Sequence, residues 1–358
     1  MEKCYTIVKR CLKGVVSVAV VKKKERIKQY MLRLIATSDK SFISKTMENF
    51  SVSKSTIYNY LKELCSEGLV ERNCQSKPPY LLKTETMLYQ YDNDGSLDED
   101  RVFDSDIIRH FETLDKNVLL VWRYAFTEMM NNAIEHSNAK RILVMVKKNA
   151  MNSSITLSDD GIGIFKNIQL YMMSEKDKEM SLDECATLLL AGKFTTAEQA
   201  HSGEGIFFTS HLMDRFLIYS DDVVFSRDNF HDIQSRIEMD DSSTLVYMEL
   251  HNKSRKTTQE VFNRFSDIDE GFIRTQIPLA HVFPNGCPVS RSEARRLGEL
   301  IVRFKEINLD FSNVDEVGQA FVHELFIVWQ NRNPDAQLNI INANSVVTGM
   351  IKRVKNTK

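Results

Sequence analysis

One predicted helix, from Asn117 to Ser137, constrains the fold of this chain more than any other segment, because its two faces differ in chemistry. At about 100° per residue, one face is apolar and consists of Trp122, Phe126, Met129, Met130 and Ala133. The opposite face is polar and consists of Glu128, Asn131, Asn132 and Glu135. A polar stripe is usually no more than the solvated side of a helix. The motifs that follow along the chain indicate a binding site instead.

Two glycine pairs follow this helix. Alternating residues predict strands over 143–147 and 154–157, and the second strand runs directly into Asp159-x-Gly161-x-Gly163. Further along, Gly203-x-Gly205 opens another apolar helix. Neither pair fits a Rossmann motif, because Lys166 and Phe208 occupy the third glycine positions. Gly192-Lys193 likewise lacks the leading glycine and the following Ser/Thr of a P-loop, so both of these common nucleotide folds are disfavoured.

Taken in order, four motifs resemble the N, G1, F and G2 boxes of the GHKL ATPases, a family that includes gyrase and the histidine kinases. They are Glu128-Met-Met-Asn131-Asn132, Asp159-x-Gly161-x-Gly163, Phe194-Thr195-Thr196 and Gly203-x-Gly205. The resemblance covers about residues 105–251 and is nearest to the anti-sigma-factor and kinase-like branch. It implies a Bergerat α/β sandwich that binds ATP together with Mg²⁺.

The resemblance also implies a role for each matched residue. Asn132 would hold the Mg²⁺ ion and Glu128 would be the general base, roles that suit an amide oxygen and a carboxylate one helical turn apart. Asp159 would accept a hydrogen bond from the adenine amino group, with Gly161 and Gly163 leaving room for the base. Further ATP contacts are expected from Asn131, Gly203, Glu204 and Gly205, the last three at a helix N-terminus that favours phosphate.

Three ATP contacts depend on weaker signals. Residues 165–202 would form a mobile lid from which Lys193 and Thr195 contact phosphate, although a lysine in a loop is more often a solvated charge. Thr244 stands where the family has a threonine that supports the adenine site, and it equally suits an ordinary strand. Phe207 departs from the family, which has a further glycine there, so an altered phosphate site is expected.

No helical hairpin with a phosphoacceptor histidine precedes the predicted ATP domain; His110 is the nearest histidine and lacks such a hairpin. An autophosphorylating histidine kinase is therefore disfavoured. A slow ATPase remains, as does an ATP-dependent protein kinase of the anti-sigma type that uses Glu128 toward a Ser/Thr hydroxyl of a separate partner. A module that holds nucleotide without turnover is the third alternative.

The net charge of −2 conceals a basic amino-terminal region on an acidic remainder. After a basic tail over 1–23, helices are predicted over 24–37 and 41–49, and a third begins at Ser53 and ends at Gly68. Two short strands, 69–72 and 80–83, follow. This order over 24–84 resembles a winged helix-turn-helix domain.

Such a domain would place its third helix in the major groove of double-stranded DNA. The outward residues of that helix are Lys54, Ser55, Thr56, Tyr58, Asn59 and Lys62. Arg72 and Lys77 of the wing would contact phosphates. The same domain would also serve as a protein-binding or dimerisation module, and a homodimer is left open.

An acidic linker is expected over 85–104, a second linker over 252–268, and a third domain with βαβαβα order over 269–358. The segments 309–314 and 317–321 resemble STAS domains, which implies docking of a protein partner. Gly318, Gln319 and Ala320 occupy the region of the phosphoserine switch, so that switch is disfavoured. Asp310 and Ser312 are interpreted as structural residues at a strand end.

The whole chain is thus predicted to be a multidomain α+β and α/β protein: winged helix, GHKL sandwich and STAS-like domain. The longest apolar run, 15–21, is too short to span a membrane. The 6 cysteines contain no CxxC pair, which favours a reducing cytoplasm over a disulfide framework or a zinc site. The function predicted is an ATP-binding transcriptional regulator.

Overall fold

The protein is represented by a computed structural model that describes residues 22–75, 77, 79–194, 203–226, 243–283 and 287–356. The chain divides into two compact units. Unit 1 comprises Met1–Met87 with Lys147–Ser153, and unit 2 comprises Leu88–Val146 with Ser154–Lys358. Helices and strands occur together in both units, which confirms the prediction of a mixed, multidomain α+β chain.

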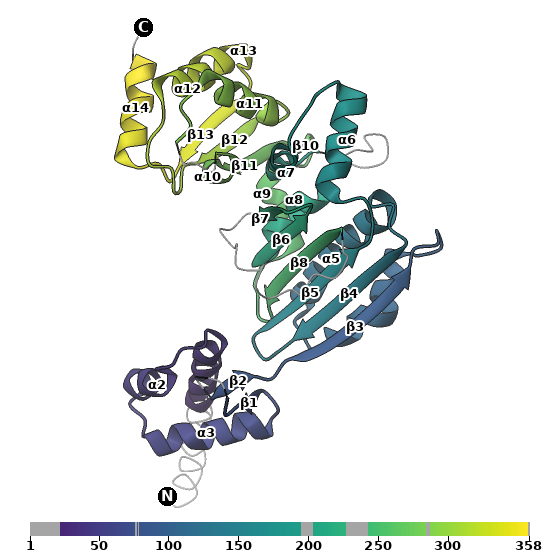
Figure 1. Cartoon of the computed structure of the whole chain (residues 1–358). Coiled ribbons are helices and arrows are strands. Elements are labelled where there is room, and N and C mark those ends of the chain that lie inside the picture. Colours follow the sequence, from purple (N-terminus) through teal and green to yellow (C-terminus); the bar gives the residue numbers. More distant parts are fainter. Residues whose placement is uncertain are drawn as a thin grey trace, which may run out of the picture. The chain divides into compact units, whose positions relative to one another are not determined.

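The described part of unit 1 contains three helices followed by a short antiparallel hairpin (Figure 1). They are a helix over 22–36, α2 (Phe42–Phe50), α3 (Lys54–Ser66), β1 (Val70–Arg72) and β2 (Tyr80–Leu82). Their apolar faces form one core, which includes Ile27, Met31, Phe42, Ile57, Leu61 and Leu64. This is the element order that the sequence predicts.

Local hydrogen bonds and ion pairs fix α3 within unit 1. The helix begins where predicted because the Ser53 hydroxyl accepts a hydrogen bond from the backbone N–H of Thr56, at 3.2 Å. The ammonium group of Lys28, on the first helix, lies 2.6 Å from the carboxylate of Glu67 and 2.9 Å from that of Glu63. Met151, from the Lys147–Ser153 segment, is buried in the same core.

A six-stranded sheet is the main feature of the first part of unit 2, with the strand order β3-β4-β5-β8-β6-β7. The strands are β3 (Glu85–Asp92), β4 (Arg141–Lys148), β5 (Asn152–Asp159), β6 (Arg215–Ser220), β7 (Val223–Ser226) and β8 (Thr244–His251). β6 runs antiparallel to both of its neighbours. Because β8 lies between β5 and β6, the end of β5 faces residues that come much later in the chain.

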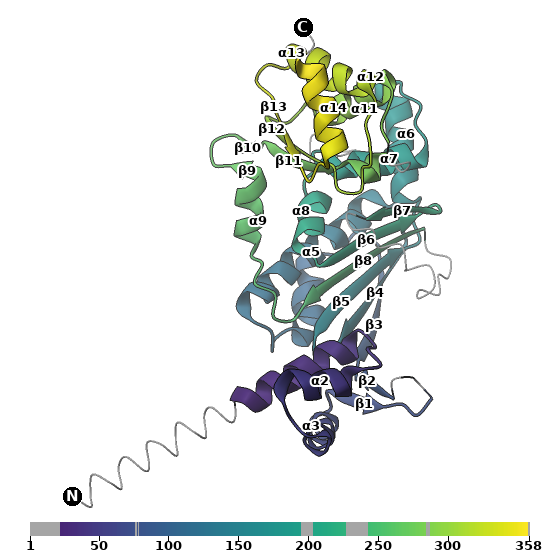
Figure 2. The same ribbon diagram turned by 90° about the vertical axis from the view of Figure 1, so that its left-hand side faces the viewer.

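Helices cover one face of this sheet, with α5 and α8 behind it in the view of Figure 2. The helices are α5 (Lys116–His136), α6 (Ile164–Lys176), α7 (Leu182–Ala191) and α8 (Gly205–Leu212). The apolar stripe of α5, including Trp122 and Phe126, is buried against strand residues such as Val144 and Leu157. The stripe is therefore what orients the polar face of α5 away from the sheet.

The prediction of an acidic linker over 85–104 is wrong in its first part, because 85–92 form β3. The acidic and polar side chains do not prevent pairing, since β3 is an edge strand whose side chains are mostly exposed. α4 (Glu99–Val102) and η1 (Phe103–Ile107) follow it. Phe103 is fully buried in the core of the sheet and helices, and so belongs to that domain.

The carboxy-terminal domain of unit 2 is built on three parallel strands in the order β11-β12-β13. The strands are β11 (Arg274–Pro278), β12 (Glu306–Asp310) and β13 (Gln337–Ile341). The helices between and after them are α10 (Leu279–Val282), α11 (Arg291–Ile301), α12 (Gln319–His323) continued by η3 (Glu324–Trp329) and α13 (Gln330–Arg332), and α14 (Ser345–Asn356). This alternation agrees with the predicted βαβαβα order.

The prediction of a linker over 252–268 is also wrong in part, because α9 (Thr258–Phe265) lies there. The Thr257 hydroxyl caps it by accepting a hydrogen bond from the N–H of Glu260. A short strand pair, β9 (Ser266–Asp267) and β10 (Gly271–Phe272), follows.

One hydrophobic core joins the two domains of unit 2. Phe207 and Phe208 of α8 are buried together with Phe265 of α9, Phe272 of β10 and the interior of the three-stranded domain. α8 therefore belongs structurally to both domains. Among the described residues, no helix has the length and apolar character needed to cross a membrane.

Candidate functional site

A cavity of about 380 Å³ lies in unit 2 among α5, α8 and the end of β5. Most residues that the sequence assigns to ATP line it, although they come from distant segments: Glu128, Asn131, Asn132, Asp159, Gly203, Glu204, Gly205 and Thr244. Gly161 and Gly163 form the turn that follows Asp159, whereas Lys193 does not line the cavity. The volume falls in the range of small-molecule sites.

The polar face of α5 forms one wall of the cavity. Within the described part of the chain, the side-chain amides of Asn131 and Asn132 are not engaged with another residue, so they are available to a ligand. Glu128 lies close to Tyr124, whose pKa is raised by burial and also by the negative charges of Glu128 and Glu204. Two carboxylates from α5 and from the start of α8 therefore lie near each other.

Asp159, at the end of β5, is the buried carboxylate of the cavity, with only 5% of its surface exposed. Burial, together with the charge of Asp160, raises the pKa of Asp159 to about 6, against the opposing effect of a hydrogen bond from the N–H of Gly161 at 2.9 Å. A hydrogen bond from an N–H donor of a ligand would stabilise the ionised form of this desolvated carboxylate. An amino group on a planar heterocycle would be such a donor.

The turn after Asp159 requires glycine for steric reasons. A side chain at Gly161 would overlap the backbone carbonyl of Ser137. Gly163 has φ of +85° and a side chain there would overlap the carboxylate of Asp221, so the turn favours glycine twice over.

Thr244 also has a defined role in this turn. Its hydroxyl oxygen accepts a hydrogen bond from the backbone N–H of Ile164 at 3.1 Å, and the Ser220 hydroxyl accepts from the same N–H at 3.2 Å. Thr244 thus fixes the start of α6 beside the cavity and is more than an ordinary strand residue.

The start of α8 forms the opposite wall. Gly203 has φ of +70° and lies against the backbone of Phe194, and a side chain at Gly205 would overlap the Glu128 carboxylate. The unpaired N–H groups and the dipole at a helix N-terminus favour an anion. Phe207, which replaces a family glycine, is 1% exposed and points into the aromatic cluster with Phe272, so it does not fill the cavity.

The charges of the cavity are acidic. Its described lining contains no lysine or arginine, and its carboxylates are Glu99, Glu128, Asp159 and Glu204. A polyphosphate would therefore need a divalent cation to enter. No group of three or more acidic, His or Cys residues suited to a metal occurs among the described residues. The Asn132 amide oxygen fits such an ion.

The two predicted phosphate contacts from the lid are Lys193 and Thr195, and the structure describes only Lys193. The ammonium group of Lys193 lies 5.2 Å from the ring centre of Phe304 and 5.5 Å from that of Phe272, so it points toward the carboxy-terminal domain. Thr195 lies outside the described residues, as does Thr196.

His136 and Asn167 also line the cavity, although the sequence does not assign them to the ATP site. His136 follows the N-box motif, and its carbonyl accepts a hydrogen bond from the Asn167 side-chain amide at 2.9 Å. His136 was visible at the end of the polar stripe, whereas Asn167 belongs to no motif, and only the fold brings α6 next to the end of α5.

The candidate DNA-binding residues of unit 1 share one face of α3. Lys54, Ser55, Tyr58, Asn59 and Lys62 are exposed, and so are Arg72 and Lys77 of the hairpin region. Thr56 differs, because its hydroxyl lies 2.9 Å from that of Ser53 and takes part in the N-terminal cap. Lys54, Ser55, Tyr58, Asn59 and Lys62 follow one another at the spacing of one helical face.

Asp310 and Ser312 act as a strand-end structural pair. The Asp310 carboxylate accepts hydrogen bonds from the Ser312 hydroxyl at 2.8 Å, from the Asn342 amide at 3.0 Å and from the Gln276 amide at 3.1 Å. Gln276 lies within β11, whereas Ser312 and Asn342 follow the ends of β12 and β13. The carboxylate therefore ties the three strands together.

Comparison with known protein families gives a match in the carboxy-terminal domain. A family described as "STAS-like domain of unknown function (DUF4325)" matches residues 293–348. The carboxy-terminal domain is STAS-like over this range, in agreement with the sequence prediction. No curated protein matches the chain.

Proposed function

We propose that this protein is a nucleotide-responsive regulator in which the cavity of unit 2 binds ATP with Mg²⁺ in the manner of GHKL ATPases. The observation that carries the proposal is the convergence of three separate motifs on one cavity. Asn132 and Glu128 come from α5, Asp159 from β5, and Gly203 and Gly205 from the start of α8.

Each wall of the cavity suits one part of the nucleotide. The buried Asp159 carboxylate would accept from the adenine amino group, and the start of α8 would offer N–H groups to the phosphates. Asn132 would hold Mg²⁺, which neutralises the phosphates in a cavity of acidic side chains. Glu128 would orient or deprotonate the attacking group.

Two observations support the proposal that nucleotide binding regulates DNA binding. The STAS-like domain is compatible with a regulatory role and shares a core with α8, the helix that begins at the phosphate side of the cavity. Unit 1 has an exposed face with Lys54 and Lys62 on α3, which suits the major groove of double-stranded DNA. Nucleotide binding would change how the STAS-like domain packs, and thereby the presentation of unit 1 to DNA.

Binding of nucleotide is tested by calorimetric titration of the full chain with Mg-ATP. Asn132→Ala should abolish Mg-ATP binding, because the residue that holds the metal is lost. Glu135→Gln is the matched control on the same helix, because Glu135 is exposed and does not line the cavity. Equal affinity in the wild type and Asn132→Ala would refute the site.

The role of Glu128 is tested with the same protein and γ-labelled ATP. Glu128→Gln should keep nucleotide binding but lose release of labelled phosphate or its transfer to a candidate STAS or sigma-type partner. Transfer of label to a partner's Ser/Thr would identify a protein kinase. Binding with neither release nor transfer in the wild type would identify a module that only holds nucleotide.

A further inference from the structure

The described lining of the cavity contains no lysine or arginine, and the ammonium group of Lys193, which lies beside the cavity in the sequence, contacts other residues. Lys193 immediately precedes Phe194, which lines the cavity. It also lies close enough to Glu204 of the cavity for the two charges to interact. Yet its ammonium group sits over the rings of Phe272 and Phe304, which belong to the carboxy-terminal domain. Its position is therefore set by that domain.

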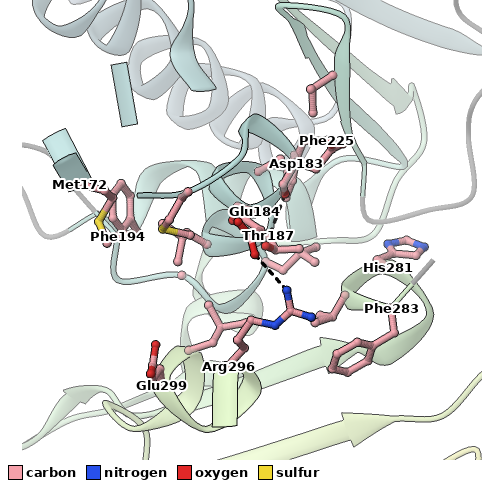
Figure 3. A pocket seen from close by; sticks show the side chains of 18 of the residues that line it. Met172, Asp183, Glu184, Thr187, Phe194, Phe225, His281, Phe283, Arg296 and Glu299 are labelled. Atoms are coloured by element: carbon pink, nitrogen blue, oxygen red, sulfur yellow. Dashed lines mark hydrogen bonds and ion pairs between the residues drawn. The ribbon is translucent and has the colours of Figure 1, made fainter. Parts of the chain in front are cut away.

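Several contacts hold the segment around Lys193 against the carboxy-terminal domain. The Arg303 guanidinium donates to the backbone carbonyl of Lys193 at 3.1 Å. The buried Thr275 hydroxyl donates to the carbonyl of Ala191 at 2.8 Å. Arg296 of α11 reaches Glu184 of α7 at 2.9 Å, as the dashed line in Figure 3 shows. These bonds bridge the edges of a cleft of about 940 Å³.

The backbone at this point is in an unfavourable conformation. Gly192 has φ of +82° and Lys193 has φ of +57°, a left-handed region that a residue with a long side chain rarely adopts. A non-glycine residue stays in this region only where its surroundings hold it, and such positions are frequent at switches. The contacts to Arg303, Phe272 and Phe304 are the surroundings that hold Lys193.

The electrostatics of this position are also unfavourable for a charged lysine. Burial lowers the pKa of Lys193, and the nearby positive charge of Arg303 lowers it further, against the opposing effect of the negative charge of Glu204. Cation–π contacts compensate in part, because an ammonium group within about 6 Å of a ring centre is attracted by the ring face. A phosphate group would interact with the same ammonium group far more strongly.

We propose that the STAS-like domain stores Lys193 in a resting position on Phe272 and Phe304, and that its release supplies the phosphate-binding cation for the cavity. The inference rests on the proposed binding of ATP. It gives the STAS-like domain a specific action: a partner that loosens this domain from α7 raises the affinity for nucleotide. Lys193 thus has two mutually exclusive positions, one against Phe272 and Phe304 and one at the phosphates in the cavity.

The first test measures hydrogen exchange of the full chain without nucleotide. Arg303→Ala and Phe304→Leu remove one contact each and should raise the exchange rate of the backbone amides over 189–194 by about three- to tenfold. Arg291→Ala is the matched control, because it removes an exposed arginine at the other end of α11 and should change nothing there. Unchanged exchange in both test variants would overturn the resting position.

The second test measures Mg-ATP affinity. Arg303→Ala should tighten binding by about three- to tenfold, since less of the protein keeps Lys193 in the resting position. Lys193→Gln should weaken binding and should make the additional change Arg303→Ala silent. Tightening by Arg303→Ala that persists in the Lys193→Gln background would overturn the inference, because the effect would not pass through Lys193.

The two tests separate this inference from the proposed function. If the wild type binds ATP but Arg303→Ala leaves both exchange and affinity unchanged, the inference is wrong and the proposed function stands. If the wild type binds no ATP, the proposed function and the phosphate role of Lys193 fail together, whatever the exchange rates.

Discussion

Replacing Asp159 by Asn should make the protein more stable at neutral pH while weakening its affinity for nucleotide. The carboxylate is buried and its pKa is raised to about 6, so keeping it ionised in the folded state costs free energy. Asn has nearly the same shape and its oxygen can still accept the hydrogen bond from the N–H of Gly161. The substitution therefore removes the cost of burying a charge without leaving a hole.

The size of the effect follows from the two pKa values. Between an unfolded pKa near 3.8 and a folded pKa of about 6, the folded chain binds more protons than the unfolded chain, so stability falls as the pH rises through this range. At about 1.4 kcal/mol per pKa unit, the cost is on the order of 3 kcal/mol at pH 7.5, and it shrinks toward zero as the pH falls to the unfolded pKa. Asp159→Asn should raise the free energy of unfolding by this cost, and the gain should be largest at neutral pH.

Urea unfolding at several pH values, followed by tryptophan fluorescence, measures the difference. Trp122 is fully buried in the core that carries Asp159, so it reports on the right part of the chain. Asp160→Asn is the matched control, because it should lower the free energy of unfolding at neutral pH where Asp159→Asn raises it. Hydrogen bonds from the backbone N–H groups of Arg141 and Lys140 lower the pKa of Asp160, so its stabilising effect is present at neutral pH and is lost on acidification. If Asp159→Asn is no more stable than the wild type at pH 7.5, the argument from burial is refuted.

Three further predictions concern other parts of the molecule. Gly205→Ala should weaken binding of a fluorescent ATP analogue, because the new methyl group would displace the Glu128 carboxylate from its place in the cavity. Gly349→Ala, whose methyl group meets nothing within 4 Å, should bind normally and gain about 0.5–1 kcal/mol in helix α14. Phe207→Ala should lower the free energy of unfolding by about 3–5 kcal/mol in a denaturant titration, since the ring is 1% exposed in the core that joins the domains of unit 2. Lys54→Ala with Lys62→Ala should reduce the slope of log K against log salt for duplex DNA by about 2, and an unchanged slope would contradict the proposed α3 interface.

The sequence predicts those elements whose apolar periodicity is strong. α5 begins and ends within one residue of its predicted bounds, because the stripe that includes Trp122 and Phe126 is long and regular. α3 is predicted from the Ser53 cap and the spacing of Ile57, Leu61 and Leu64. For α3, the Ser53 cap and one buried face determine the element, whereas for α5 the long buried face is sufficient without a side-chain cap.

The sequence does not predict elements whose apolar pattern is weak or interrupted, such as β3 and α9. β3 is an edge strand with little burial, so its Met87, Tyr89 and Tyr91 alternation gives a weak signal beside the acidic residues that follow. α9 has only one fully buried residue, Phe265, and its Thr257 to Glu260 cap was the available signal. Such segments are ordered mainly by neighbours that are distant in sequence.

The sequence predicts those residues of the candidate site that lie on regular elements. Motif residues such as Asn132, Asp159 and Gly205 line one cavity because each lies at the end or on the face of a regular element. The position of Lys193 could not be predicted, since it depends on Phe272 and Phe304 from another domain. Sequence spacing carries no information about which of two domains holds a side chain.

The most direct test of the account measures the coupling between nucleotide and DNA on the full chain. The affinity for mixed-sequence duplex DNA is measured at low salt with and without saturating Mg-ATP, and the affinity for Mg-ATP with and without saturating DNA. The account predicts that each ligand changes the affinity for the other by the same factor, different from one, and that Asn132→Ala removes the effect of Mg-ATP. Tight binding of both ligands with a factor of one would contradict nucleotide control of DNA binding.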